Sequence, residues 1–82
     1  MKNNDKQTQE LVFKVLTEVT GLNIEDIHLD NSLKDDLHIG AALMTELVGK
    51  FATLGIELKP EDVSNLDTVS NLVDLVDLVK EV

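Results

Sequence analysis

Apolar residues spaced three and four apart recur along most of this 82-residue sequence, and this helical spacing constrains the fold more than any other feature. In the first segment the apolar positions are Leu11, Val12, Val15, Leu16 and Val19. A stripe of this kind buries one face of a helix, so the pattern predicts a helix over about residues 5–20. Asn4 or Asp5 can cap its start, and Gly21 suits the left-handed turn that follows a helix.

A second helix is predicted to begin after Gly40 and to end at Gly55. Its apolar surface is wider than one stripe: Ala42, Leu43, Leu47, Val48, Phe51 and Leu54. Gly49 lies inside this helix, where glycine costs about 1 kcal/mol relative to alanine. We therefore expect close packing against Gly49.

Two further helices are predicted in the last third of the chain. Pro60 suits the first position of a short helix, whose first turn then carries Glu61 and Asp62. Asp67 is the expected cap of a final helix over residues 68–82. The positions expected to face inward on that helix are Val69, Leu72, Val73, Val76 and Val79.

The long connection over residues 22–40 carries apolar residues at a density that predicts a segment held on the core: Leu22, Ile24, Ile27, Leu29, Leu33 and Leu37. The fold class is therefore all-α. We expect a four-helix bundle of three main helices and one short helix, with a long structured first loop. The whole chain, residues 1–82, fits one domain, with residues 1–5 as a flexible N-terminus.

Charge and composition narrow the possible partners. The chain has sixteen acidic residues and seven basic residues, all lysines, for a net charge of −9. This charge repels phosphate backbones and anionic lipid, so we expect neither a nucleic-acid nor a membrane partner. The absence of cysteine excludes disulfides and thiolate chemistry. The polar N-terminus lacks the apolar stretch of a signal peptide, which favours a cytoplasmic location.

The sequence favours neither an enzyme nor a metal site. His28 and His38 lie in the long loop, where histidines are usually solvated. The loop acids fail the calcium-loop pattern, because counting from Asp30 places Lys34 at the fifth position and no glycine at the sixth. Phosphate-binding glycine motifs and a nucleophile elbow are also missing. We expect no catalytic residues and no metal ligands.

The segment DNSLKDDLHIGAALMTELVGKF, followed by IELKPEDVSNLDTVSNLVDLV, resembles the acyl and peptidyl carrier proteins. The resemblance covers about residues 9–80. Its elements, in family-like order and spacing, are Ser32-Leu33, Asp36-Leu37, Glu46-Leu47-Val48, Phe51, Ile56, Pro60 and Leu66-Asp67-Thr68-Val69. No single element is specific, but the ordered set is.

The resemblance implies a protein that tethers thioester cargo on a 4′-phosphopantetheine arm and performs no chemistry alone. In that family the arm is attached to a serine that opens the second helix. The corresponding residue here is Ala41, flanked by Gly40 and Ala42, and alanine offers no nucleophile. As written, the chain cannot be loaded. The residues expected to contact an arm or a partner are Ile39, Leu43, Met44 and Leu47. Met44 is expected at the surface, although methionine is more often a core filler.

Two explanations of Ala41 remain open. In the first, the parent protein has serine there and a deliberate Ser→Ala change keeps this chain unmodified. In the second, the chain is a natural arm-less relative that docks a biosynthetic enzyme. Gly40 favours the second, because the family usually has Asp or His at that position. The hydroxyls of Ser32, Thr45, Ser64 and Ser70 are interpreted as structural or surface groups. An acidic helical bundle unrelated to carriers is a third interpretation.

The predicted second helix carries Glu46 against Lys50, whereas fatty-acid carriers resemble one another in having several acids there. This favours a discrete carrier of a polyketide or nonribosomal-peptide pathway. The implied partners are a phosphopantetheinyl transferase, an acyl- or aminoacyl-loading enzyme, and synthase or transferase enzymes. We expect a monomer.

Overall fold

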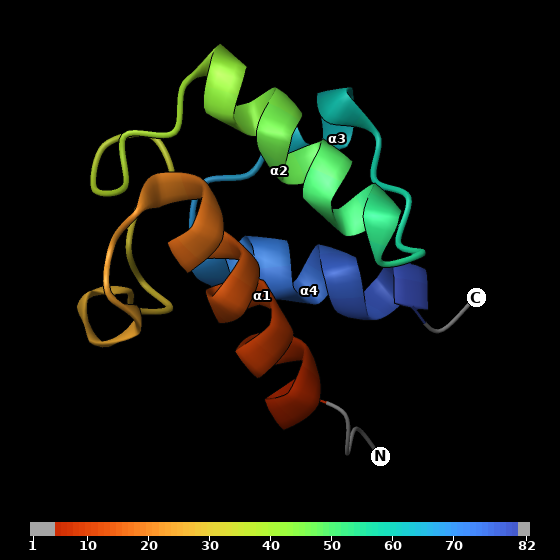
Figure 1. Cartoon of the computed structure of the whole chain (residues 1–82), viewed down its shortest axis with the longest axis horizontal. Helices are drawn as coiled ribbons and strands as arrows, with labels where there is room; N and C mark the ends of the chain where they lie inside the picture. The colour runs from red at the N-terminus through yellow and green to blue at the C-terminus, as the bar shows by residue number, and fades with distance from the viewer. Residues whose placement is uncertain (1–4, 81–82) are drawn as a thin grey trace.

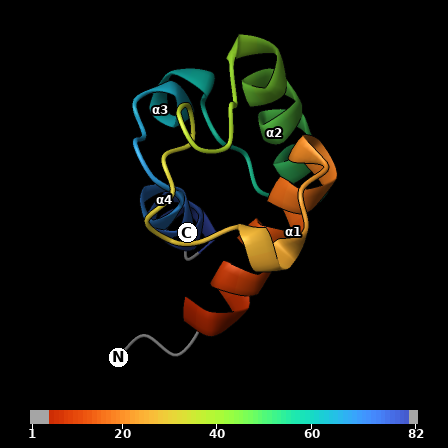
Figure 2. The ribbon, with the colours of Figure 1, turned by 90° about the vertical axis from the view of Figure 1, so that its left-hand side faces the viewer.

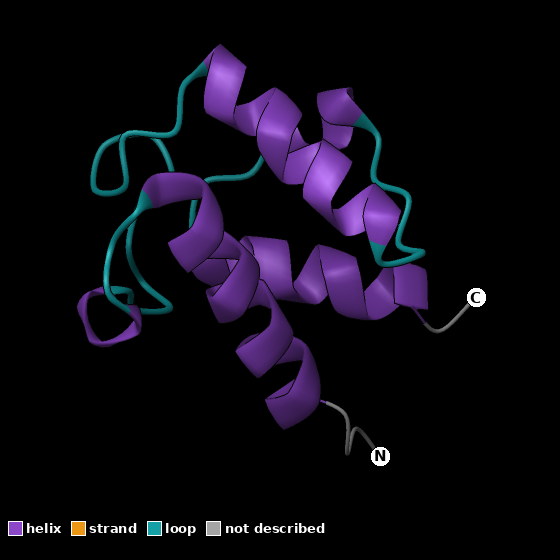
Figure 3. Ribbon diagram, in the orientation of Figure 1, coloured by secondary structure: helices purple, strands orange, loops and turns teal. Residues whose placement is uncertain are grey.

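The structure, a computed structural model, describes residues 5–80 and is all-α in that range, as predicted (Figures 1 and 3). Its elements in chain order are α1 (Asp5–Thr20), the 3₁₀ turn η1 (Ile24–Asp26), α2 (Ala41–Thr53), α3 (Pro60–Ser64) and α4 (Val69–Lys80). Three main helices and one short helix are thus confirmed. The predicted flexible start covers residues 1–5 and the predicted cap is Asn4 or Asp5; residues 1–4 lie outside the described residues, and Asp5 is the first residue of α1.

The ends of α1 and α2 follow the predicted glycine signals. Gly21 has φ 81° and its N–H donates to the carbonyl of Thr17 at 2.9 Å, which closes α1. Gly55 has φ 83° and follows the end of α2 in the same way. Glycine adopts this left-handed conformation without the steric cost of a side chain.

The cap of α4 is Thr68, so the prediction of Asp67 was wrong. The Thr68 hydroxyl accepts a hydrogen bond from the N–H of Asn71 at 3.2 Å, and the Asn71 side-chain oxygen accepts one from the N–H of Thr68 at 3.2 Å. This reciprocal pair satisfies two backbone donors at the helix start. Asp67 instead uses its carbonyl to accept the N–H of Leu33 at 2.8 Å.

Helix α1 packs against both α2 and α4, and α3 packs against α2, so the chain closes around one core (Figures 1 and 2). The largest fully buried apolar side chains come from all four helices and the loop: Val12, Leu16, Ile27, Leu33, Ile39, Leu47, Phe51, Val63, Val69, Leu72 and Val76. Leu, Val and Ile supply most of this packing, because aromatic residues make up only 2% of the chain.

Backbone hydrogen bonds fasten the first loop to the start of α4. The N–H of Val69 donates to the carbonyl of Asn31 at 3.0 Å, and the N–H of Ser70 donates to that of Leu29 at 2.8 Å. Ser32 and Thr68 pair as an isolated antiparallel bridge. These hydrogen bonds hold the loop in a fixed position against the start of α4.

The loop buries fewer side chains than its apolar density predicts. Ile27, Leu33 and Leu37 are buried, whereas Leu22, Ile24 and Leu29 are exposed. Hydrogen bonds to the α4 start also hold this segment, so a few buried side chains are enough to anchor it. The close packing expected at Gly49 is wrong, since a Cβ there would meet nothing within 4 Å.

Candidate functional site

The start of α2 is the part of the fold that the resemblance assigns to an attachment point. Gly40 is the N-cap residue, with φ −89° and ψ −164°, and it supplies no side chain to cap the helix. Its carbonyl accepts the N–H of Met44 at 2.8 Å, which forms the first helical turn. Ala41 and Ala42 therefore begin the helix with their side chains exposed to solvent.

Ile39 fixes this helix start to the core. Its side chain is fully buried, and its N–H donates to the carbonyl of Leu33 at 2.9 Å. His38, immediately before it, has φ 57°, a left-handed conformation that turns the chain toward α2. Ala41 thus follows the buried Ile39 by two residues, and Ile39 fixes the position of the exposed Ala41 relative to the core.

Two open hollows flank Ala41, with volumes of about 510 and 440 Å³. Both are lined by Ala41, Met44 and Ser64, so they meet between the start of α2 and the end of α3. The first also reaches Lys34 and His38 in the loop. The second continues over Pro60 at the start of α3. Together they give position 41 an open groove on both sides and no enclosed pocket.

Position 41 itself carries no reactive side-chain group. Ala41 ends in a methyl group, and the hydroxyls beside it are engaged with the backbone. Ser64 donates to the carbonyl of Glu61 at 3.0 Å, and Thr45 donates to the carbonyl of Ala41 at 3.2 Å. Each closes a local turn of its own helix.

Ser32 has the structural role that was interpreted for it. Its hydroxyl accepts the N–H of Asp35 at 3.0 Å, while its own N–H donates to the Asp36 carboxylate at 2.7 Å. These bonds fold the loop turn that precedes Leu37, whose side chain is buried. The arrangement explains why a serine-leucine pair occurs at this point of the loop.

The predicted contact residues differ in their accessibility. Ile39 and Leu47 are fully buried, and Leu43 is half-buried. The expectation of an exposed Met44 was wrong. Met44 is only 7% exposed and belongs to the hydrophobic core. Of the predicted site residues, Gly40, Ala41 and Ala42 are the exposed ones. Contact of the four predicted residues with an arm or partner stays a prediction.

Sequence reasoning missed the residues that form the far wall of the groove. Lys34, His38, Pro60 and Glu61 line the hollows beside Ala41 although they come from other elements. Pro60 and Glu61 are about twenty positions from Ala41 along the chain, so the sequence gives no signal that they lie beside it. Pro60 begins α3, and the packing of α3 against α2 brings Pro60 and Glu61 to the site.

Residues 5–80 offer neither a metal-binding cluster nor a membrane-spanning helix. No three His, Asp or Glu side chains in that range gather closely enough to hold a metal ion. None of its helices combines the length and apolar character needed to cross a membrane.

Comparison with known proteins matches most of this sequence to one family. Residues 10–76 match the family described as a phosphopantetheine attachment site. The chain is 34% identical over 65 residues to the acyl carrier protein of Micrococcus luteus, covering 78% of this chain and 80% of that protein. It is 36% identical over 64 residues to the acyl carrier protein of Renibacterium salmoninarum, covering 77% and 79%, and 33% identical over 64 residues to that of Myxococcus xanthus, covering 77% and 81%.

The prosthetic group of this family is 4′-phosphopantetheine, and its members are carriers, not enzymes. Ala41, at the position that the resemblance assigns to the attachment serine, does not fit that group, because a methyl side chain cannot form the phosphodiester. The matched region nevertheless runs from within α1 to within α4, through the first loop and the start of α2. By the extent of both matches, the chain belongs to the acyl carrier protein family.

Proposed function

We propose that this fold serves as a discrete carrier that presents acyl or aminoacyl thioesters from an arm at position 41, and that alanine replaces the attachment serine in this chain. The observation that carries the proposal is the geometry of Ala41. It is the exposed first residue of α2, it follows a buried anchor at Ile39, and open hollows lie on both sides. A serine hydroxyl there would face a transferase without displacing other side chains.

The charge of α2 supports polyketide, nonribosomal-peptide or related biosynthesis as the pathway. Glu46 is its one acidic residue. Lys50 lies near the far end of the helix and forms an ion pair with Glu18 of α1 at 3.3 Å. A partner enzyme whose basic patch binds several acidic residues would contact only Glu46 on α2. This surface therefore fits partners that bind mainly through apolar contacts.

An arm-less interaction protein is the second candidate. Gly40, Ala41 and Ala42 give the start of α2 three consecutive small residues with exposed backbone or methyl groups. A Cβ at Gly40 would meet nothing within 4 Å, so packing does not require glycine there. These three small residues favour a protein that carries no cargo and docks a biosynthetic enzyme through the start of α2.

We also propose a domain organisation, an oligomeric state, a location and a set of partners. We place the whole chain, as one domain and a monomer, in the cytoplasm. Its proposed partners are a phosphopantetheinyl transferase, a loading enzyme and a synthase or transferase. The net charge of −9 supports contact with basic protein surfaces and opposes contact with nucleic acid or anionic lipid.

Intact mass spectrometry tests the proposal. The chain, its Ala41→Ser variant and its Ala42→Ser variant are each incubated with coenzyme A and a promiscuous phosphopantetheinyl transferase, after circular dichroism has shown that all three are folded. We expect the mass of one phosphopantetheine to be gained by Ala41→Ser alone. Ala42→Ser is the matched control, since it places an equally exposed hydroxyl one residue further along α2.

Other results would change the assignment. A gain only in Ala42→Ser would move the attachment point and refute the placement at position 41. No gain in any variant would put the arm-less interaction protein ahead. Serine at position 41 in the gene would exclude that second candidate.

A further inference from the structure

A second groove lies at the opposite end of α2 from Ala41. It consists of two hollows of about 160 and 490 Å³, which share Leu11 of α1 and Leu54 at the end of α2. None of the residues that line it also lines the hollows beside Ala41. We call it the Leu11–Leu54 groove.

The floor of the Leu11–Leu54 groove is apolar and partly open. Val15 and Ile56 are buried beneath it, and Leu11 is half-buried along its wall. Leu54 is 52% exposed, which is a large fraction for a leucine that lines a hollow. Val79 of α4 forms the far side. Two adjoining apolar hollows can each receive one apolar side chain.

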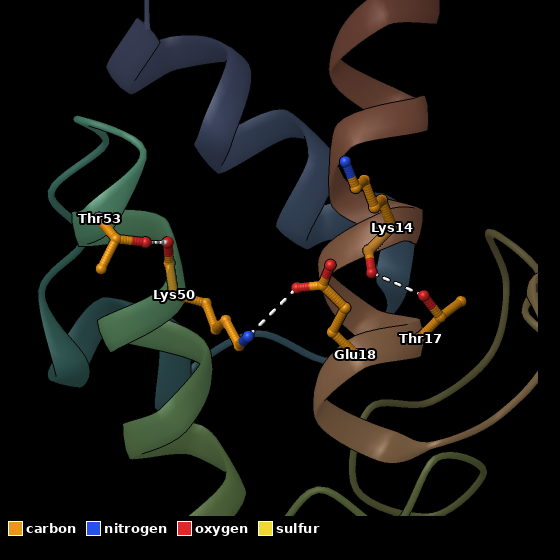
Figure 4. A network of polar contacts seen from close by, with 5 residues as sticks. All are labelled: Lys14, Thr17, Glu18, Lys50 and Thr53. Atoms are coloured by element: carbon orange, nitrogen blue, oxygen red, sulfur yellow. Dashed lines mark hydrogen bonds and ion pairs between the residues drawn. The ribbon is translucent and has the colours of Figure 1, made fainter.

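The rim of this groove is positive, in contrast to the chain as a whole. Its charged residues are Lys14, Lys50 and Lys80 against Glu18, a net of two positive charges on a chain of −9. Three of the chain's seven lysines thus surround one groove. Glu18 is already paired, since its Oε1 lies 3.3 Å from Nζ of Lys50 (Figure 4). Its negative charge is therefore offset at the rim.

Lys14 and Lys80 flank the apolar floor from two helices. Figure 4 shows the Lys14 side chain extending from α1, one turn from Glu18, and Lys14 forms no ion pair with the rest of residues 5–80. Lys80, near the end of α4, approaches the Thr8 hydroxyl with its Nζ at 3.3 Å. The same hydroxyl donates to the buried Asp77 carboxylate at 2.9 Å, so Asp77 offsets part of the Lys80 charge, and Lys14 is the rim lysine that keeps its full charge for a partner.

We propose that the Leu11–Leu54 groove docks an acidic amphipathic helix of a partner protein. Helices dock in apolar grooves through side chains at i, i+3, i+4 and i+7, and two adjoining hollows suit two such anchors. Glutamates or aspartates on the flanks of that helix would meet Lys14 and Lys80. This contact is independent of any arm at position 41, because it uses the other end of α2.

Other occupants fit the charges less well. An anionic membrane would be repelled by the net charge of −9, which a local excess of two positive charges does not reverse. A second copy of this chain carries the same net charge and would be repelled in the same way. A partner that offers a short acidic segment meets the lysines without bringing its whole surface close.

The probe is a synthetic helical peptide with leucines at i, i+3, i+4 and i+7 and flanking glutamates, and a matched peptide has lysines in place of the glutamates. Titration into ¹⁵N-labelled protein should shift the amides of Leu11, Lys14 and Leu54 and leave those of Gly40 and Ala41 unchanged. Fluorescence anisotropy should show tighter binding of the acidic peptide, and added salt should weaken it.

Matched variants separate the groove from general charge and hydrophobicity. Lys14→Glu should weaken the acidic peptide about fivefold, the effect of one rim ion pair, whereas Lys59→Glu makes the same charge change at an exposed site outside the groove and should have little effect. Leu54→Ser should weaken binding, and Leu78→Ser, at a residue 65% exposed and outside the groove, should not.

Several results would overturn the proposal. These are equal or tighter binding of the lysine peptide, equal weakening by Lys14→Glu and Lys59→Glu, or amide shifts confined to Gly40 and Ala41. Concentration-dependent dimerisation in sedimentation that Leu54→Ser abolishes would assign the groove to a second copy. Binding to phosphatidylglycerol vesicles that Leu54→Ser abolishes would assign it to a membrane.

Discussion

The hydroxyl of Thr8 donates a hydrogen bond of 2.9 Å to Oδ1 of Asp77, and this bond joins α1 to α4 inside the bundle. Both side chains are buried. Nζ of Lys80 lies 3.3 Å from the same hydroxyl and places a cation beside the pair. A buried carboxylate requires hydrogen-bond donors, so this contact fixes how the two helices align in a core that is otherwise apolar.

Replacing Thr8 by valine keeps the shape of the side chain and removes its donor. Asp77 would lose one buried hydrogen bond, and we expect the free energy of unfolding to fall by about 1–3 kcal/mol. Urea titration followed by circular dichroism measures the change. Thr17→Val in the same helix is the control, because the Thr17 hydroxyl bonds only to the nearby Lys14 carbonyl at an exposed site (Figure 4). A change at Thr8 no larger than at Thr17 would contradict the role assigned to the buried pair.

The sequence predicts the helices but not this contact. The α1 stripe is visible because its apolar residues repeat every three and four positions. Helical spacing places Thr8 in line with Val12 and Asp77 in line with Val73, but a separation of 69 residues gives no signal that the two side chains meet. The packing of α1 against α4 brings the two side chains together.

Truncation of Leu47 or Val15 tests the core. Both side chains are buried, so Leu47→Ala and Val15→Ala should each lower the free energy of unfolding by about 2–4 kcal/mol, through lost burial and a residual cavity. Chemical denaturation monitored by circular dichroism gives the values. Leu78→Ala removes the same atoms as Leu47→Ala from a side chain that is 65% exposed, and should change stability by about 0.5 kcal/mol or less. Neutral results at both buried positions would refute the core assignment.

Gly49 and Gly55 form a matched pair of glycine sites. Gly49 lies inside α2, and a Cβ added there would meet nothing within 4 Å, so Gly49→Ala should raise the free energy of unfolding by about 0.5–1 kcal/mol. Gly55 has equal space but φ 83°, so Gly55→Ala should lower it by about 1 kcal/mol or more. Thermal unfolding of the two variants beside the parent compares them. A loss of stability at Gly49 would show that the helix needs glycine there.

The sequence predicts where residue 41 lies in the fold, but not which side chains surround it or how exposed they are. The resemblance places Ala41 at the start of α2, and Gly40 precedes it as the N-cap residue. Met44 is buried because α3 packs over that face of α2, and a helical pattern alone does not say where a neighbouring short helix lies. The cap at Thr68 was missed for a similar reason. Asp67 has an equally good capping side chain, but its carbonyl is taken by the loop N–H of Leu33.

The stability of the fold should not depend on Ala41. The residue is exposed at the first helical position, and Gly40 holds the cap position before it, so Ala41→Ser should change the free energy of unfolding by about 1 kcal/mol or less. Gly40→Ser is the comparison variant. It would supply the side-chain cap that α2 lacks, in an extended backbone and in open space, and should add a few tenths of a kcal/mol. Urea titration of both variants gives the two differences. A loss above about 3 kcal/mol in Ala41→Ser is larger than an exposed helix-start residue can cause, and it would mean that position 41 is packed and not presented to solvent.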